Sequence, residues 1–241
     1  MPSGSIRWKN LGSDRGVGFD LRVTVTNPAT VYSELLDVEY VSPSSAATSQ
    51  GVFTDSGYAC IGFGLRASYC YSGSALDPDT AECLDGTPTT MRAAEFDFHF
   101  MRAGTNEHMP AFPRMFTTFF DVDGDTIDGK SLFEMNAVLG STSLSIAPSA
   151  RDTLKVGVVG GRMEVSYAIA TQAVNVRTDF SASPATPSEV SLPAIVSFEV
   201  VQKSSFRVLL GGRSSVSLSD RGYCFAMVEQ EFIPECSPPP S

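Results

Sequence analysis

The chain has 241 residues, 42% of them hydrophobic, which is enough for a sizeable core in a single β-sandwich or barrel domain. Its 27 acidic residues outnumber 17 basic ones, and a charge of −10 with no basic run argues against nucleic acid or an anionic membrane surface as a partner. No apolar run approaches the ~20 residues of a membrane-spanning helix and no signal peptide is visible, so we expect no direct membrane insertion.

The first part of the chain alternates apolar stretches with turns. Residues 19–26 place apolar and polar side chains on opposite faces, as a half-buried strand does, with Asp20 and Arg22 on the polar face. Trp8 is the only tryptophan, and we expect it to fill the core. Residues 72–90 form the longest irregular stretch, a candidate partner-facing loop. Further strands are expected at residues 35–41, 59–65 and 68–71, the last two paired as a hairpin.

Residues 93–101 alternate again, with three phenylalanines on one face and polar side chains on the other. The aromatic face belongs in a core. The polar face, with two acids and a histidine, fits a solvated strand face or, alternatively, a ligand patch. The phenylalanines are Phe96, Phe98 and Phe100, and the polar side chains are Glu95, Asp97 and His99.

The aromatic and β-branched residues 112–120 predict a buried strand that leads directly into a turn rich in carboxylates. Later segments continue the pattern of short strands between turns, and hairpins are predicted around Gly160-Gly161 and across residues 202–205. These later strands are expected at residues 132–139, 153–159, 163–169, 173–180, 192–201, 206–210 and 223–228.

About a dozen short strands with Gly and Pro punctuation, and no segment of helical period, predict an all-β fold. We expect an antiparallel two-sheet β-sandwich, jelly-roll-like, formed by residues 1–236 as a single domain. Residues 237–241 are rich in proline and are predicted to form a disordered tail or linker.

The five cysteines form no close C-x-x-C pair of a zinc ribbon or redox site, and their settings suit disulfide bonds in an oxidising compartment. We expect Cys60–Cys70 to close a hairpin and Cys224–Cys236 to hold the C-terminal segment, which leaves Cys83 over. Five buried thiols are the alternative. The expected setting is extracellular, at a cell surface or in an oxidising lumen.

The acidic turn is the candidate metal site. Calcium takes about six to eight oxygen ligands from carboxylates and carbonyls in flexible loops. The D-x-D-x-D spacing resembles the start of an EF-hand loop, but the glycine follows at the fourth position instead of the sixth, and strands flank the turn. A β-sandwich type of Ca²⁺ site and a plain acidic turn both remain open. The candidate ligands are Asp121, Asp123, Asp125, Asp128 and Glu134.

The sequence offers few catalytic groups. A Ser-His-Asp or Cys-His arrangement would have to use His99 or His108, the only histidines, and no G-x-S-x-G motif is present. A pair of strand-borne carboxylates could instead hydrolyse glycosides, with Glu134, Glu164 and Glu199 as candidates. Aromatic sugar platforms are scarce, so we expect no catalytic residues and keep the glycosidase as the weaker alternative.

Several short segments of the chain form a set of motifs. They include Phe19 to Asn27, Phe96-x-Phe98, Thr118 to Asp123, Val196-x-Phe198 and Arg221 to Phe225. Together these segments resemble a loosely defined group of secreted β-sandwich domains of microalgae and bacteria, whose function is not established. The resemblance covers nearly the whole chain and implies an extracytoplasmic jelly-roll module, often part of a larger surface protein. It transfers no catalytic residue, and Asp121, Asp123 and Glu134 match acidic positions of the group.

These observations predict a non-catalytic extracellular or lumenal binding module that takes a glycan or a protein through its loops, with a possible structural Ca²⁺. The alternative is a structural or accessory subunit of a larger assembly, held through residues 72–90 and the proline-rich tail.

Overall fold

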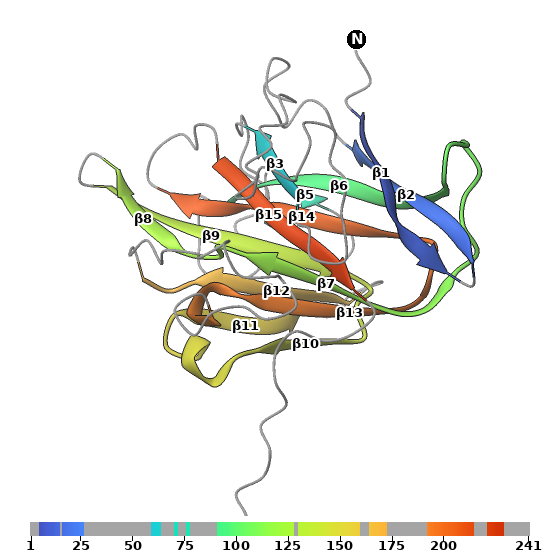
Figure 1. Ribbon diagram of the computed structural model, residues 1–241. Coiled ribbons are helices and arrows are strands. Elements are labelled where there is room, and N and C mark those ends of the chain that lie inside the picture. The colour runs from blue at the N-terminus through green and yellow to red at the C-terminus, as the bar shows by residue number, and fades with distance from the viewer. Residues whose placement is uncertain are drawn as a thin grey trace, which may run out of the picture.

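The structure is a computed structural model that describes residues 5–14, 16–26, 59–63, 70–71, 76–77, 91–127, 130–159, 164–172, 192–214 and 221–228. Its strands form two large antiparallel sheets and a separate two-stranded one (Figure 1), so the predicted all-β sandwich is confirmed. Several predictions fall outside the described residues: the strands at 35–41 and 173–180, most of the loop 72–90, Asp128, Cys83, Cys236 and the tail 237–241.

The larger sheet has eight strands, in the order β1-β2-β6-β14-β9-β12-β11, with β8 added alongside β9. Every pairing in it is antiparallel. The bounds are β1 (Ser5–Asp14), β2 (Val17–Val25), β6 (Met91–Arg102), β8 (Gly124–Ile127), β9 (Lys130–Leu139), β11 (Leu154–Val159), β12 (Val165–Ala170) and β14 (Ser205–Ser214).

The smaller sheet has five strands, in the order β10-β13-β7-β15-β3. Among the described residues the helical elements are short 3₁₀ turns, and no helix there is long and apolar enough to cross a membrane. The bounds are β3 (Ala59–Phe63), β7 (Phe112–Phe120), β10 (Ser143–Ile146), β13 (Val196–Lys203), β15 (Arg221–Val228), the separate pair β4 (Cys70–Tyr71) and β5 (Leu76–Asp77), and the turns η2 (Pro148–Ala150) and η3 (Leu192–Ala194).

Two predicted hairpins are wrong, although their strands exist. β3 pairs with β15 in the five-stranded sheet, whereas β4 pairs with β5. Likewise β13 and β14 follow each other in sequence but lie in different sheets, so residues 202–205 carry the chain across the sandwich. The backbone of Gln202 has φ of 52° at this crossing, and the Ser204 carbonyl accepts a hydrogen bond from Phe100 N at 2.9 Å. Alternation identifies a strand's buried face, but it does not identify the neighbouring strand.

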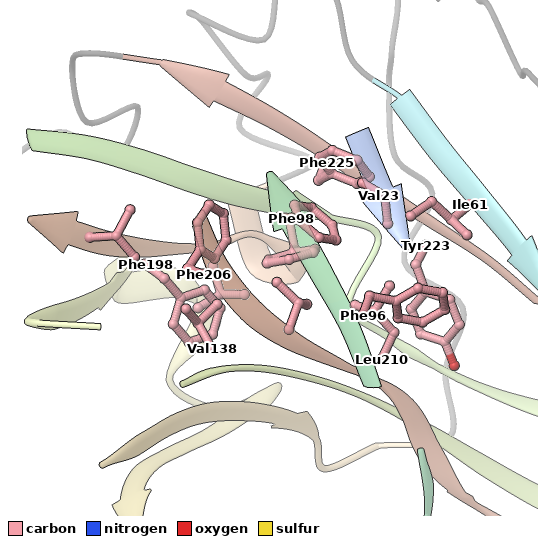
Figure 2. Close-up of a cluster of buried hydrophobic side chains, with 14 of the residues drawn as sticks. Val23, Ile61, Phe96, Phe98, Val138, Phe198, Phe206, Leu210, Tyr223 and Phe225 are labelled. Carbon is pink, nitrogen blue, oxygen red and sulfur yellow. The ribbon is translucent and has the colours of Figure 1, made fainter. Parts of the chain in front are cut away.

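The main core fills the space between the two sheets and is dominated by aromatic rings. Phe98 of β6 lies at its centre, with ring centroids 5.4 Å from Phe206 in the same sheet and 5.1 Å from Phe225 in the facing sheet (Figure 2). Trp8 is fully buried, as predicted, and its ring meets Phe225 edge-on at 5.7 Å. The alternating phenylalanines of residues 93–101 therefore face the core as the sequence indicates.

A second hydrophobic cluster is buried on the opposite face of the eight-stranded sheet, where strands β9 and β12 run. The same face carries charged side chains farther along, on β2, β6 and β14. This outer face of the eight-stranded sheet is therefore apolar along β9 and β12, and it carries charged side chains toward β2, where a polar site can form. The cluster consists of Ala93, Met135, Ala137, Val165, Tyr167, Ile169 and Leu209.

Strands β14 and β9 approach each other closely at Gly212. A Cβ atom there would lie 2.6 Å from the carbonyl oxygen of Phe133, which belongs to the backbone of β9 and cannot rotate away. We therefore expect Gly212→Ala to lower the free energy of unfolding by about 1–3 kcal/mol, measured by urea denaturation. Gly222→Ala is the matched control, because nothing lies within 4 Å of its Cβ position. Equal losses in both variants would contradict the close approach.

Cys224 of β15 is disulfide-bonded. Its register partner on the neighbouring strand β3 is Cys60, directly opposite it in the ladder. From this register we predict a Cys60–Cys224 bond. The Cys60–Cys70 and Cys224–Cys236 pairs expected from the sequence are the alternatives, and Cys236 lies outside the described residues. Peptide mapping of the non-reduced protein should recover Cys60 and Cys224 in one cross-linked fragment, and recovery of either other pair would contradict the prediction.

Candidate functional site

The predicted acidic turn lies where the chain leaves β7 and enters the other sheet. Asp121 turns the backbone with φ of 64°, and Val122 N is anchored on Ala194 O at 2.9 Å. The following residues are not a turn, because Gly124–Ile127 forms strand β8 and pairs with β9. This part of the prediction is wrong, because short polar strands lack the alternating signal on which the prediction depends. Asp125 consequently lies opposite Leu132 in a ladder.

Two of the five predicted metal ligands lie beside each other on neighbouring backbones. Glu134 N donates to Asp123 O at 2.9 Å, and both residues are only 4% exposed. Asp121 and Asp125 are partly exposed, and Asp125 Oδ1 accepts a hydrogen bond from the following amide, Thr126 N, at 2.7 Å. Within the described ranges, no three His, Cys, Asp or Glu side chains form a group that could hold a metal ion. The calcium site stays a prediction.

The strand-borne carboxylates considered for glycoside hydrolysis lie apart in the fold. Glu134 is buried in β9 of the eight-stranded sheet, and Glu164 is exposed just before β12. Glu199 belongs to β13 of the five-stranded sheet, where it accepts hydrogen bonds from Thr142 Oγ1 and Ser143 Oγ, each at 2.9 Å. These two hydroxyl donors hold the Glu199 carboxylate in place.

The pKa of Glu199 lies below its ordinary value of 4.5. Burial alone would raise it, but hydrogen bonds from Ser143, Thr142 and Arg114, together with the Arg114 charge, more than offset that effect. A general acid needs the opposite shift, because it must keep its proton near neutral pH. Glu199 is therefore suited to joining β10, β13 and β7 through these contacts.

A buried ion pair lies at the other end of the sandwich. Asp20 of β2 was expected on the polar face of a half-buried strand, but it is 0% exposed. Its Oδ2 accepts Arg7 Nε at 2.9 Å and lies 2.7 Å from Arg7 Nη2, and it also accepts Gly104 N at 3.1 Å. The prediction for Asp20 failed because the residues that cover it come from β1 and from a loop more than eighty positions away.

The same arginine fixes the loop between β6 and β7, residues 103–111, which we call the clamped loop. Arg7 Nη1 donates to Asn106 Oδ1 at 3.1 Å, and Arg7 Nη2 donates to Thr105 O. Ala103 N donates to Gly18 O at 2.9 Å, and Met109 is buried in the main core. Figure 1 shows this green loop beside the β1–β2 hairpin, at the opposite end from β8. The loop is thus anchored at its beginning and near its end.

The clamped loop nevertheless exposes side chains on both sides of the buried Met109. These exposed side chains combine an amide, a carboxylate, an imidazole and small apolar groups, so they offer both hydrogen-bonding groups and apolar contacts. Residues of this kind on a loop held by a rigid scaffold are typical of binding sites. They are Asn106, Glu107, His108, Pro110 and Ala111.

The predicted ligand patch on the outer face of β6 is largely self-paired. Arg207 of β14 lies 2.6 Å from Glu95 Oε1 through Nη1, and its Nε donates to Asp97 Oδ1 at 2.8 Å. Glu95 is buried, not solvated, and this burial raises its pKa above 4.5, although the Arg207 charge opposes the shift and Asp97 adds to it. Both carboxylates are therefore engaged by the arginine, which leaves the histidine as the remaining member of the patch.

The pKa of His99 lies below its ordinary value of 6.5. Burial is the main cause, and the charges of Arg22 and His108 add to it while Asp97 opposes them. The folded chain therefore prefers neutral His99, so His99 contributes stability above pH 6.5 that is lost as the pH falls through the folded pKa. We expect the free energy of unfolding to decline between pH 7 and pH 5, with a shallower decline in His99→Gln.

Urea denaturation at several pH values checks this dependence. Glu199→Gln is a suitable control, because the pKa of Glu199 is lowered from 4.5 and its contribution is lost only at more acidic pH. The same slope in the wild type and in His99→Gln would show that another group causes the decline.

No family model and no curated protein matches the chain. Among solved structures the chain is similar to the N-terminal domain of the Streptococcus gordonii adhesin Sgo0707, with 12% sequence identity and a TM-score of 0.49. The similarity covers 94% of this chain and 48% of the adhesin chain, so this chain spans about half the length of that structure.

Proposed function

We propose that this chain is a non-catalytic extracellular binding module whose recognition surface is the clamped loop. The observation that carries the proposal is the Arg7–Asp20 ion pair. Arg7 donates to Thr105 O and Asp20 accepts Gly104 N, so the pair holds the loop backbone while Asn106, Glu107 and His108 stay exposed. A loop already held in one conformation loses little conformational entropy when it binds, so more of the contact energy contributes to affinity. The expected ligand is a glycan or a protein surface rich in hydrogen-bonding groups.

The side chains of the loop suit a ligand with hydroxyl or amide groups. Because Asn106 Oδ1 accepts a hydrogen bond from Arg7, the side-chain amide is held in a defined orientation. Glu107 is 75% exposed and pairs only loosely with Arg102 at 3.4 Å, so its carboxylate can accept hydrogen bonds from a ligand. The disulfide bond of Cys224 supports the extracellular or lumenal setting, since such bonds persist in oxidising compartments.

The test compares the wild type with an Asn106→Ala/Glu107→Ala variant on a glycan array and on polysaccharide columns. We expect retention of the wild type and its loss in the variant. Arg151→Ala is the control, because Arg151 is exposed and precedes β11, the edge strand of the sheet opposite to β1. Equal retention of wild type and variant would remove the loop from the proposal, and release of reducing sugars from a bound polysaccharide would contradict the non-catalytic part.

A structural Ca²⁺ near Asp121, Asp123 and Glu134 remains part of the proposal. It is supported by the adjacent backbones of Asp123 and Glu134 and by the burial of both residues. Bound calcium would raise the melting temperature, because a ligand that binds only the folded state stabilises it. A thermal melt with and without a chelator tests this, and no shift in melting temperature would remove calcium from the account.

One observation favours the alternative, a subunit of a larger assembly. Edge strand β11 exposes Val156 and Val158, with 36% and 56% of their surfaces accessible. Exposed apolar side chains on a sheet edge are typical of strands that pair with another chain. Size-exclusion chromatography of the native extract distinguishes the two functions, since co-migration with a large complex favours the subunit and a free monomer favours the binding module.

A further inference from the structure

The only two histidines of the chain meet in the fold. His99 and His108 are nine positions apart, and their ring centroids are separated by 5.2 Å with an angle of 78° between the planes. Strand β6 carries His99 on its outer face, and the chain reverses at Gly104, whose φ of 72° suits glycine, to bring His108 back beside it.

Backbone contacts fix the positions of both residues. His99 lies in register between Arg22 of β2 and Ser205 of β14. His108 forms a bridge with Met101. Hydrogen bonds lie on both sides of that bridge, from Arg102 N to Glu107 O at 2.7 Å and from Met109 N to Phe100 O at 2.9 Å. The backbone therefore places the two residues beside each other before any ligand arrives.

His99 also has an unused nitrogen. Its Nδ1 atom is buried and has no hydrogen-bond partner among the described residues, an arrangement that costs free energy in a folded protein. Burial and the neighbouring Arg22 lower the pKa of His99, and the neutral imidazole is the form that binds a metal ion.

We propose that His99 and His108 together bind a divalent transition-metal ion such as Zn²⁺, Ni²⁺ or Cu²⁺. Imidazole nitrogens bind such an ion at about 2.0–2.1 Å, and two imidazoles on one tetrahedral ion hold their ring centroids about 5 Å apart. The observed 5.2 Å matches that spacing. The remaining positions of the ion are open to water or to a group of a bound partner, as in sites with incomplete protein ligation.

The surroundings decide the strength and selectivity of this site. The Arg22 charge next to His99 opposes a second positive charge, so the affinity is moderate and Arg22→Gln should increase it. Asp97, on the same strand face, is engaged by Arg207, which fits a site with two ligands from the part of the chain that the structure describes. Calcium and magnesium require oxygen ligands, so neither should compete here.

Proton NMR of the intact chain provides the test, because only two histidines contribute imidazole signals. At pH 7.5 we expect ZnCl₂ or NiCl₂ to shift or broaden both signals together, with one ion bound per chain by calorimetry. His99→Gln and His108→Gln should each weaken metal binding by at least about tenfold. Even residues that only hydrogen-bond to a metal ligand contribute that much to metal affinity. Glu164→Gln, an exposed carboxylate elsewhere, should bind as the wild type does.

Thiol-blocked protein is used throughout, so that cysteine cannot supply the ligands. No binding, binding unchanged in both histidine variants, or displacement of Zn²⁺ by excess CaCl₂ would each overturn the proposal. Far-UV circular dichroism confirms that the variants are folded. The outcome is independent of the proposed function, because retention on glycans is measured separately in the presence of a chelator.

Discussion

Replacing Arg7 by methionine is expected to lower the free energy of unfolding by about 3–5 kcal/mol, the usual cost of breaking a buried ion pair by removing one partner. Methionine keeps much of the aliphatic side chain but removes the cation that lies 2.7 Å from the Asp20 carboxylate. Asp20 is fully buried, so water cannot replace the lost charge. The same change also removes the hydrogen bonds to Thr105 and Asn106 that hold the clamped loop.

Urea denaturation measures the loss. Arg102→Met is the matched control, because Arg102 and Glu107 form an exposed pair at 3.4 Å that should contribute less than about 1 kcal/mol. Adding Asp20→Asn to Arg7→Met should recover part of the stability by removing the buried charge. Equal small losses in both arginine variants would show that the Arg7–Asp20 pair is exposed to solvent.

Replacing Phe98 by alanine is the second substitution with a large expected effect. Phe98 is fully buried, and its ring joins Phe206 of its own sheet to Phe225 of the facing sheet (Figure 2). Truncating a buried phenylalanine in a close-packed core costs about 3–5 kcal/mol, because the cavity fills only in part. For a chain of this length the melting temperature should fall by roughly 10 °C.

Val158→Ala serves as the control for Phe98→Ala. Val158 is 56% exposed on edge strand β11, so its truncation should change the free energy of unfolding by less than about 0.5 kcal/mol. Differential scanning calorimetry of both variants measures the difference. A small effect of Phe98→Ala would mean that the two sheets do not pack through these rings.

The strands with strong alternation or aromatic content were predictable from the sequence. Phe96, Phe98 and Phe100 face the core as expected, and the strands around Leu21 and Phe119 lie where the pattern places them. Side-chain alternation depends only on the backbone period, so a single strand reveals its own buried face. This explains why the fold class could be predicted from local patterns.

Pairing partners and buried charges were not predictable in this way. Asp20 looks like a solvated residue in its strand, and only the loop around Gly104 and the side chain of Arg7 make its position an interior one. Glu95 was misplaced for a similar reason, since its burial depends on neighbouring strands and on Arg207. Such contacts join distant parts of the chain, and no local pattern records them.

The candidate site was predicted only in part. The acidic stretch directed attention to Asp123 and Glu134, which do lie side by side along the backbone. The sequence did not indicate a role for the clamped loop, although Gly104 marks the reversal that brings His108 back to His99. A glycine between two histidines at this spacing, just after a strong strand, was the signal that could have indicated their contact.

Amide hydrogen exchange of the clamped loop tests most directly whether the Arg7–Asp20 pair holds a preformed recognition surface. The account predicts slow exchange at Ala103, Gly104 and Met109, whose amides donate to Gly18 O, Asp20 Oδ2 and Phe100 O, and a selective loss of this protection at Ala103 and Gly104 in Arg7→Met. Exchange at the rate of an unstructured peptide in the wild-type protein would contradict it.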